Sequence, residues 1–493
     1  MHSKQHTYTA VTEQRGVKRL WLQGLRLSES GFEKGGRYRV DYDLDKGLLH
    51  LIADPHGDRA VSGRVRGDRV EPIVDICNAT VVEFAGDAAR VRADFFLGRI
   101  TFSVSHRDQA RRDREARLKS ELDAGCITEG SLCTGIGMAA EATHEGFRRM
   151  GVQTSLSWVV DRDRRYVQAA LDNAACVDEN TTLFEASLEE IEPELLSPVS
   201  ILQASLPCTG HSRAGKTKNK LDLAEAHKTD ATAVIGFIRI LEAVNPSIVI
   251  SENVCAARGS ATYLLLKSYL TALDYTIKEV DMGPDDTNSV EVRRRYWFVA
   301  VSNGLTQVDL TRLPHFERRY QTIGDLLEDI GDDHPDWRNH DYLKAKQVRD
   351  AAAGKGFANR CLLTASDTSI ATAPRTYAKR QSTSPFLVRD DGMERLFTPK
   401  ELCRAHSAPE HLIDGLSNAV AYEGLGQGID FRQGMAIAMV VARDCLFKDK
   451  FAVAASLCLS RSFNLGVQTS DSRVVSSPAF NYWPETIRLP ASE

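Results

Sequence analysis

The pattern of apolar and polar positions divides the chain into segments of different kinds. From residue 16 to residue 106, runs of alternating apolar and polar residues are separated by turn signals such as EKGG and DPHGD. Each run predicts a strand: KRLWLQGLRL, YRVDYDL, GLLHLIA, ATVVEF, ARVRADFF and RITFSVS. The stretch SHRDQARRDREARLKSELDAG, which starts at Ser105, is dense in alternating charge and predicts a solvated helix or linker. We therefore expect a β-rich N-terminal domain over residues 1–105 and a charged connector over 106–125.

In the next segment, short apolar runs alternate with helical patterns. CITEGSL, QTSLSWVVD, PVSILQASLP and PSIVISENV predict strands, whereas AAEATHEGFRRMG and TDATAVIGFIRILEAVN predict helices. This alternation predicts an α/β fold with a doubly wound, mostly parallel sheet. A later run, RRRYWFVAVS, adds a strand, so the domain extends over residues 126–304. Residues 305–385 are irregular and polar, helical patterns return over 386–449, and 450–493 form a C-terminal extension.

Composition narrows the class of protein. A chain of 493 residues is too long for a single hydrophobic core, so two or three domains are expected. Its content of 42% hydrophobic and 26% charged residues is that of a soluble globular protein. The net charge of -5 does not by itself indicate a nucleic-acid partner. Ten cysteines without a CxxC pair argue against a zinc site or a disulfide scaffold. There is neither an apolar signal-peptide core nor a window of the roughly 18 apolar residues that span a membrane. We expect a cytoplasmic protein with no metal and no membrane contact.

The first predicted strand, loop and helix, SLCTGIGMAAEA, suit a ligand. Gly135 and Gly137 let the turn approach a bound molecule, and the helix N-terminus favours polar or anionic groups. Asp161 ends the next strand, in VVDRDRRY, where a carboxylate can accept hydrogen bonds from ribose hydroxyls. Because the Gly-x-Gly-x-x-Gly fingerprint is absent, an adenosyl ligand without phosphates fits better than a dinucleotide. A tight structural turn and an exposed Asp are the alternative interpretation.

The loop LPCTGHSRAGK places Cys208, after Pro207, at the carboxyl end of a strand. A structural cysteine is usually buried among apolar residues, whereas this one precedes a hydrophilic, cationic segment. Nearby cations would favour the thiolate form and would also suit a phosphate backbone. The predicted nucleic-acid contacts are Ser212, Arg213, Lys216 and Lys218. A solvated loop is the alternative.

Two further strand positions carry candidate chemistry. Glu252, in SENV, lies at the same predicted sheet edge, where a buried carboxyl with a raised pKa could donate to a ring nitrogen. In VEVRRRYWFVAV, strand alternation places Arg293 and Arg295 on one face and Arg294 on the other. Two guanidinium groups on one face suit a base carbonyl and a phosphate. Plain surface positions are the alternative for all of them.

In this order, the motifs resemble those of the cytosine-C5 DNA methyltransferases. SLCTGIG is similar to that family's first cofactor loop, LPCTGHSRAGK to its Pro-Cys nucleophile loop, SENV to its Glu-Asn-Val motif and VEVRRRYWFV to its Gln-x-Arg-x-Arg strand. FLVRDDGMERLFTPKELCRAHSAPEHL and GLGQGIDFRQGMAIA resemble its last two motifs, so the match runs from residue 126 to residue 445. The resemblance implies the class I S-adenosylmethionine-dependent methyltransferase fold, with a small target-recognition domain over 305–385.

The resemblance also implies site residues and a reaction. Cys208 would add to C6 of a flipped cytosine, Glu252 would contact N3 and the exocyclic amine, Arg295 would hold O2 and Arg293 would support the loop. C5 would then accept the methyl group of S-adenosyl-L-methionine. The implied cofactor-binding residues are Cys133, Thr134, Gly135, Gly137, Asp161, Arg162, Ser187, Pro207, Gln427 and Gly428. The implied partner is double-stranded DNA, in the nucleoid of a bacterium or of a phage-infected cell.

Several positions depart from the family's pattern. The residues after Pro-Cys are usually Gln or Asn, then a spacer and Phe, and here they are Thr209, Gly210 and His211. The family usually has Phe where Cys133 stands and Asp where Ser187 stands. It usually has Gln where Glu291 stands and Asn where Gln427 stands. The nucleophile, the carboxyl group and the two arginines are all retained, so we expect a divergent but active enzyme.

The N-terminal segment KRLWLQGLRLSESGFEKGGRYRVDYD resembles SymE-type toxins, whose fold is related to the AbrB swapped hairpin. Such domains often dimerise and bind DNA, so this one could provide a homodimer interface or a further DNA contact. A β-rich scaffold without either role is the alternative.

Three other functions fit parts of the sequence. An RNA cytosine-C5 methyltransferase would share the fold, because one branch of the family modifies tRNA. A non-catalytic DNA-binding regulator would be consistent with Cys133 and Ser187 in a degenerate cofactor site. A thiol hydrolase would need a histidine near Cys208, for which His211 and His227 are candidates by position only.

Overall fold

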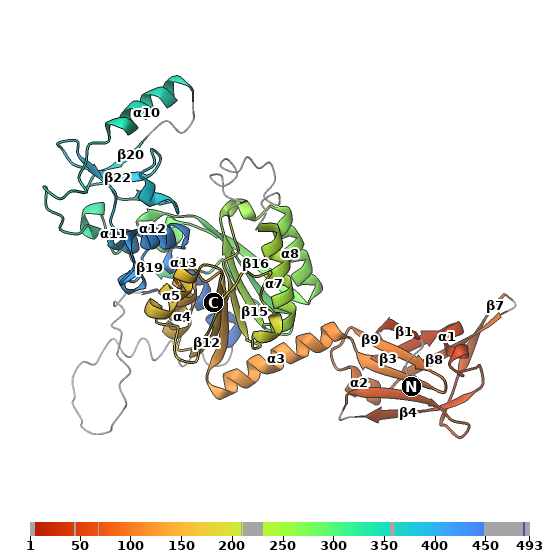
Figure 1. Ribbon diagram of the computed structural model, residues 1–493. Helices are drawn as coiled ribbons and strands as arrows, with labels where there is room; N and C mark the ends of the chain where they lie inside the picture. The colour runs from red at the N-terminus through yellow and green to blue at the C-terminus, as the bar shows by residue number, and fades with distance from the viewer. Residues whose placement is uncertain are drawn as a thin grey trace, which may run out of the picture. The chain divides into compact units, whose positions relative to one another are not determined.

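The computed structural model describes residues 5–43, 46–67, 69–208, 210, 230–354, 360–447 and 487–488. The chain forms two compact units, Met1–Asp113 and Arg114–Glu493. Each unit has hydrophobic clusters of its own. Figure 1 labels their elements.

The N-terminal unit contains two antiparallel sheets that share one core. Side chains of both sheets fill this core, among them Leu20 and Val74 from one and Leu49 and Phe102 from the other. The six-stranded sheet has the order β1 (Gln5–Ala10), β9 (Arg90–Phe96), β10 (Arg99–Val104), β5 (Leu48–Ala53), β4 (Arg37–Asp43), β6 (Arg59–Ala60). The four-stranded sheet has the order β2 (Thr12–Gln14), β3 (Val17–Gln23), β8 (Arg69–Cys77), β7 (Ser62–Arg66).

The predicted strand ATVVEF is wrong, because these residues belong to helix α2 (Ala79–Ala85). The Asn78 side chain caps the helix by accepting a hydrogen bond from the Val81 amide at 3.1 Å, and Gly86 ends it with a φ of 50°. Val81, Phe84 and Ala85 are buried, which is helical spacing. The second half of KRLWLQGLRL is likewise helical, in α1 (Leu25–Glu29).

The charged stretch after Ser105 forms helix α3 (His106–Ala124), but one side of it is buried. Arg114 donates to the Ser302 hydroxyl at 2.9 Å, and its guanidinium lies 3.8 Å from the ring centre of Tyr275. Leu118 is buried one turn later. The expectation of a fully solvated helix was therefore wrong, because a long arginine side chain can be buried when its guanidinium has acceptors and an aromatic face.

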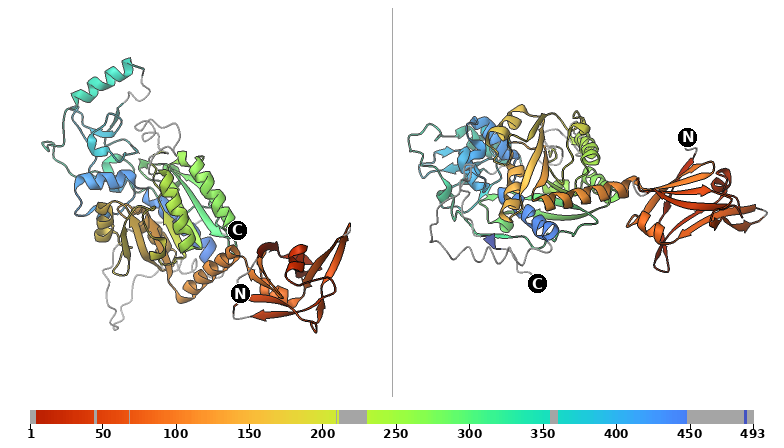
Figure 2. Two further views of the ribbon diagram at one scale, coloured as in Figure 1. Left: turned by 45° about the vertical axis from the view of Figure 1, so that its right-hand side comes forward. Right: turned by 90° about the horizontal axis from the view of Figure 1, so that it is seen from below.

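The second unit is built on a seven-stranded sheet, and the predicted doubly wound, mostly parallel α/β fold is confirmed. Its first five strands pair in parallel, and β18 runs antiparallel to both neighbours. The order is β13 (Thr182–Glu185), β12 (Thr154–Asp161), β11 (Ile127–Leu132), β14 (Ile201–Ala204), β15 (Ile248–Asn253), β18 (Arg295–Ser302), β16 (Tyr275–Met282). One face carries α7 (Asp230–Val244) and α8 (Ala261–Ala272), seen in green in Figure 2, and the other carries α4 (Met138–Arg149), α5 (Arg164–Asn173) and α13 (Phe431–Val441).

The chain returns to this sheet after an irregular region. The irregular part contains short strands and helix α10, and the return contains α11, α12 and α13, which packs along α4. Their bounds are β19 (His315–Phe316), α10 (Asp341–Ala352), β20 (Cys361–Leu363), β21 (Ile370–Ala371), β22 (Pro385–Val388), β23 (Glu394–Arg395), α11 (Pro399–Ala405) and α12 (Asn418–Gln427). β21 pairs with β17 (Glu291–Val292), which precedes β18. From the C-terminal extension, β24 (Ile487–Arg488) pairs with β19. Among the described residues, no helix is long and apolar enough to cross a membrane, and no cluster of His, Cys, Asp or Glu could hold a metal.

Candidate active site

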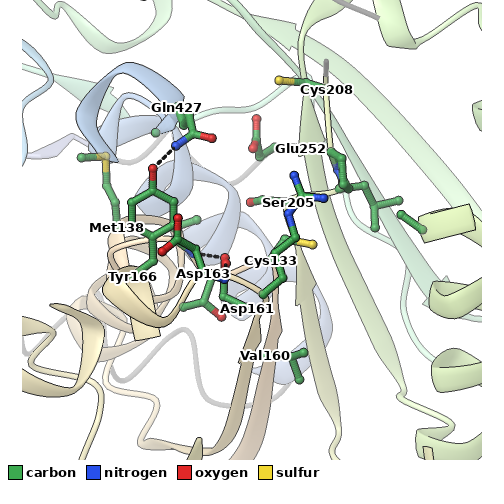
Figure 3. A pocket seen from close by; sticks show the side chains of 18 of the residues that line it. Cys133, Met138, Val160, Asp161, Asp163, Tyr166, Ser205, Cys208, Glu252 and Gln427 are labelled. Carbon is green, nitrogen blue, oxygen red and sulfur yellow. Dashed lines mark hydrogen bonds between the residues drawn. The ribbon is translucent and has the colours of Figure 1, made fainter. Parts of the chain in front are cut away.

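A cavity opens where the parallel strands β11, β12, β14 and β15 end (Figure 3). Its walls combine these strand ends with the start of α4, the start of α5 and the end of α12. The predicted cofactor residues that line it are Cys133, Thr134, Gly135, Asp161, Arg162, Ser187, Pro207, Gln427 and Gly428. Of the predicted catalytic residues, Cys208, Glu252 and Arg295 line it. The structure thus brings together residues that lie up to 295 positions apart, from Cys133 to Gly428.

The loop after β11 forms the floor of the cavity. Cys133 has a φ of 54° and Gly135 a φ of 57°, so two left-handed residues turn the chain sharply before α4. Gly137 does not line the cavity: it precedes α4 with a φ of 89°, and a Cβ there would lie 2.7 Å from the Ala174 Cβ. Its role is close packing between α4 and the end of α5. Burial raises the pKa of Cys133, which keeps the group a neutral thiol.

Asp161 connects this loop to the end of β12. One carboxylate oxygen accepts the Gly135 amide at 2.8 Å, and the other accepts the Asp163 amide at 2.9 Å. Burial raises the pKa of Asp161, and the two amides oppose that shift. Both oxygens have further lone pairs beside the cavity, which fits the hydroxyl pair of a ribose.

Ser187 stands at the end of β13, where the family usually has Asp. Its hydroxyl donates to a carboxylate oxygen of Glu190 at 2.7 Å, and this bond lowers the pKa of Glu190. A carboxylate therefore remains next to this position, three residues along the chain.

Cys208 is half-buried at the mouth of the cavity, four residues after β14. Asn253 holds the strand end before it, because its side-chain amide donates to the Leu206 carbonyl and to the Tyr263 hydroxyl, each at 2.9 Å. The predicted nucleic-acid contacts Ser212, Arg213, Lys216 and Lys218 lie outside the described residues, as do His211 and His227.

Glu252 is buried at the end of β15, in the wall opposite Gln427 (Figure 3). Burial raises the pKa of its carboxyl, and the Arg295 guanidinium opposes that shift. The Arg295 Nε lies 3.5 Å from Glu252 Oε2, and this oxygen has no hydrogen bond within the described part of the chain. Because a buried oxygen without a hydrogen bond is costly, Oε2 is suited to accept or share a proton with a ligand atom in the cavity.

Arg293 and Arg295 meet at one carbonyl. Arg293 Nη1 donates to the Gly428 carbonyl at 2.9 Å and Arg295 Nη2 donates to it at 3.1 Å, whereas Arg294 is exposed beside Asp285. Arg293 is fully buried outside the cavity wall.

Glu291, which stands where the family usually has Gln, is the counterion of Arg293. The Arg293 Nε donates to Glu291 Oε2 at 2.7 Å, and the Ala373 amide donates to Glu291 Oε1 at 2.8 Å. Although burial alone would raise the pKa of Glu291, the Arg293 and His406 charges hold it below its ordinary value. The departure from Gln therefore provides Arg293 with a charged partner.

Sequence reasoning did not assign six of the polar residues that line the cavity, which are Asp163, Tyr166, Glu189, Ser205, Asn253 and Arg375. Tyr166, in the first turn of α5, and Arg375, from the irregular region, both line it. Tyr166 follows Asp161 by five residues, so its place after a strand end was a usable signal. Arg375 carried none, because its position depends on how the irregular region folds back against α12, where a Cβ on Gly426 would lie 2.5 Å from Pro374.

The sheet order, the helices on both faces and a cavity at the carboxyl ends of the strands define a methyltransferase fold. The family model described as C-5 cytosine-specific DNA methylase matches residues 129–443, and the chain belongs to this family. It is therefore a cytosine-C5 methyltransferase, and the family implies S-adenosylmethionine as the methyl donor.

The chain is similar to several solved structures. The chain is similar to the methyltransferase EhMeth of Entamoeba histolytica, with a TM-score of 0.52, 15% identity and coverage of 64% of this chain and 98% of that one. It is also similar to Dnmt2 of S. pombe, with a TM-score of 0.48 and 16% identity over 64% of this chain and 99% of that one. For a putative DNA modification methyltransferase encoded within an E. coli prophage, the TM-score is 0.45 and the identity 14%, over 64% and 99%. No curated protein matches the chain by sequence.

Proposed function

We propose that this protein is a DNA cytosine-C5 methyltransferase that forms a covalent bond between Cys208 and C6 of the target base. The observation that carries the proposal is the convergence of Cys208, Glu252 and Arg295 in the cavity that Asp161 and the first loop also line. A nucleophile, a carboxyl of raised pKa and a fixed cation are the groups that attack on a cytosine ring requires.

The proposed reaction has three steps, which are addition to the ring, methyl transfer and elimination. As the Cys208 thiolate bonds to C6, the electrons of the C5–C6 double bond move into the ring, and Glu252 donates a proton or a hydrogen bond at N3. Arg295 is close enough to Glu252 to hold the neighbouring O2. C5 would then bond to the methyl carbon that S-adenosylmethionine supplies, as the bond from that carbon to the sulfonium sulfur breaks and S-adenosylhomocysteine is left. Loss of the C5 proton to a base from solvent, return of the N3 proton to Glu252 and departure of the Cys208 thiolate would restore the aromatic ring.

The residues of the cavity fit S-adenosylmethionine. Asp161 would accept the ribose hydroxyls, because its oxygens are fixed by two backbone amides and still have free lone pairs. Cys133, Arg162 and Ser187 would border the adenine, and Gln427 with Gly428 would border the amino-acid portion. Thr134 and Pro207 complete the wall between these ends.

We extend the proposal to duplex DNA as the substrate. The faces of a base are inaccessible in a duplex, so the target cytosine must be flipped into the cavity. Residues 305–385 would read the site, and Arg375 brings this region to the cavity wall.

The N-terminal unit would add a DNA contact through the β7–β8 hairpin, which projects beyond the core of that unit (Figure 1). In its register Arg66 is opposite Arg69 and Arg64 is opposite Glu71, and every described side chain from Arg64 to Val70 is exposed. Like charges directly opposite each other destabilise a hairpin, and a bound phosphate would relieve that repulsion.

The test uses a duplex that carries 5-fluorocytosine at candidate sites, incubated with S-adenosylmethionine. Fluorine cannot leave C5 as a proton does, so the adduct is trapped, and we expect a complex that survives denaturant. Cys208→Ala should abolish it, whereas Cys126→Ala, at an exposed cysteine outside the cavity, should leave it unchanged.

Each other outcome identifies a different function. A trapped complex with RNA but not with DNA would replace DNA by RNA as the substrate. A trapped complex that persists in Cys208→Ala would overturn the assignment of the nucleophile. No complex with either nucleic acid, over a broad set of sequences, would leave a binding protein with a methyltransferase fold.

A further inference from the structure

Tyr166 and Gln427 form a hydrogen-bonded pair in the wall of the cavity (Figure 3). Tyr166 lies in the first turn of α5 and Gln427 ends α12, so the pair joins segments 261 positions apart. The Gln427 Nε2 donates to the Tyr166 hydroxyl at 2.6 Å and to the Glu423 carbonyl at 3.1 Å. The Tyr166 hydroxyl in turn donates to Glu423 Oε2 at 3.4 Å.

These bonds fix the orientation of the Gln427 amide. The two hydrogens of Nε2 are bound by the Tyr166 hydroxyl and the Glu423 carbonyl, so Oε1 is the atom that Gln427 presents to the interior, on the side of Glu252 (Figure 3). A flipped amide would set Oε1 against the Glu423 carbonyl and the Tyr166 oxygen, whose hydrogen is directed at Glu423. Burial raises the pKa of Tyr166 to about 12, so the hydroxyl keeps its hydrogen at neutral pH.

The hydrogen bond between Tyr166 and Gln427 also explains how a side chain longer than Asn can serve at this position. The family usually has Asn at this position, and Gln adds one methylene and one rotatable bond, whose freedom must be removed before the amide can serve as a fixed acceptor. Tyr166 removes it, because the hydroxyl holds the end of the longer side chain. Tyr422, on the same helix, instead donates to the Phe397 carbonyl at 2.7 Å and does not line the cavity.

We propose that Tyr166 is a positioning residue, which holds the Gln427 amide so that Oε1 accepts a hydrogen bond from the α-ammonium group of the bound cofactor. The inference rests on the proposed function. Gln427 adjoins Gly428, whose carbonyl binds Arg293 and Arg295 near the reacting end, whereas Asp161 marks the ribose. The amino-acid portion of the cofactor lies between these two ends. Its ammonium group is the donor from which a neutral amide oxygen can accept a hydrogen bond.

The experiment compares two ligands by titration calorimetry on the full chain. S-adenosylhomocysteine carries the amino-acid portion, and 5′-methylthioadenosine has the same adenosine and sulfur without it. In Tyr166→Phe we expect the dissociation constant of S-adenosylhomocysteine to rise roughly three- to tenfold, the effect of one hydrogen bond. That of 5′-methylthioadenosine should change less than about twofold by the same reasoning. Tyr422→Phe, the matched control, should leave both unchanged.

A double-mutant cycle tests whether Tyr166 acts through Gln427. Gln427→Leu should weaken the binding of S-adenosylhomocysteine but not that of 5′-methylthioadenosine. Adding Tyr166→Phe to it should cause no further loss of affinity, because the oriented amide is already absent. Three results would each overturn the proposal: equally weaker binding of both ligands, losses of affinity that add in the double variant, or an unchanged affinity in Tyr166→Phe. If Tyr166→Phe fails to fold, Gln427→Leu still decides, since equal weakening of both ligands contradicts the role of Oε1.

Binding of the two ligands to the wild-type chain distinguishes a failure of the proposed function from a failure of this inference. A wild-type chain that binds neither ligand would refute cofactor binding and this inference together. A wild-type chain that binds both leaves the variants to test the positioning role alone.

Discussion

Glu252 combines two properties of a proton donor to a ring nitrogen. Burial raises the pKa of its carboxyl, and its Oε2 has no hydrogen bond among the described residues although Arg295 lies 3.5 Å away. The protonated form is the one that can donate at N3, so the rate should depend on the fraction of Glu252 that is protonated.

Glu252→Gln should lower kcat by about 10²- to 10⁴-fold, because an amide can donate a hydrogen bond at N3 but cannot transfer a proton. In the wild type, kcat should fall as the pH rises through the raised pKa of Glu252, and this alkaline limb should be absent from the variant. Initial rates over a range of pH at saturating DNA and cofactor measure both. A limb that persists in Glu252→Gln would assign it to another group.

Cys133→Phe restores the ring that the family usually has at this wall of the cavity. An aromatic ring should stack on adenine, so the dissociation constants of S-adenosylhomocysteine and 5′-methylthioadenosine should both fall, by roughly three- to tenfold. Because residue 133 has a φ of 54°, the variant retains the strained backbone of the wild type. Calorimetry checks the expectation, and a weaker affinity for both ligands would show that the ring does not fit.

At this scale, the predictable site residues are those beside strand ends. Cys208 and Glu252 follow apolar runs directly, so the geometry of a parallel sheet alone places them at one edge. Tyr166 lies five residues after Asp161, so it too follows a strand end, although the prediction did not use that signal. Arg375 lines the cavity because the irregular region folds back against α12. Local pattern does not include such long-range packing, which is why Arg375 was missed.

At the scale of elements, the contact between α4 and α13 brings the end of α12 to the cavity. Small residues make this contact close: a Cβ on Gly434 would lie 2.7 Å from the Ala142 Cβ, and one on Gly146 would lie 2.5 Å from the Met435 carbonyl oxygen. Since α13 begins three residues after Gly428, its seating on α4 fixes Gln427 and Gly428. The same elements show the limits of local pattern, because α4 and α13 were both predicted as helices but the contact between them was not predicted.

Gly146→Ala should lower the free energy of unfolding by about 1–3 kcal/mol, because backbone rather than a flexible side chain blocks the added methyl group. Gly259→Ala, at a glycine with open space around it and no left-handed φ, is the matched control and should change stability little. Urea unfolding of both variants measures the difference. Wild-type stability in Gly146→Ala would show that α13 can move away from α4 at low cost.

The segment ATVVEF was predicted as a strand but is helical, and α3 was predicted as a solvated helix or linker but is a helix with one side buried. ATVVEF has the composition of a strand, but the cap at Asn78 and the buried face of Val81, Phe84 and Ala85 select a helix. α3 has the composition of a solvated helix, but Arg114 finds three acceptors and the ring of Tyr275. In both cases tertiary contacts outweighed local propensity.

At the scale of the whole molecule, the two units have separate cores, so the N-terminal unit can contribute binding without forming part of the catalytic cavity. Its β7–β8 hairpin concentrates Arg64, Arg66 and Arg69 on exposed backbone, with Glu71 as the described carboxylate beside them. Under the proposed function, this hairpin would enter a groove of duplex DNA, as the strands of β-ribbon readers do.

A triple variant of the full chain, Arg64→Gln, Arg66→Gln and Arg69→Gln, tests this contact through the salt dependence of DNA binding. Each lost phosphate contact removes about 0.9 from the slope of log K against log salt, so the slope should become shallower by about 2 to 3. Arg15→Gln, Arg26→Gln and Arg99→Gln, at exposed positions of the same unit, change the charge equally and should not alter it. Fluorescence anisotropy of a labelled duplex at several salt concentrations gives the slopes, and kcat at saturating DNA should stay at the wild-type value. Equal slopes in the two variants would show that the salt dependence follows the net charge of the unit and not the hairpin. Loss of a dimer in the first variant alone would make the hairpin a contact between two copies of the chain.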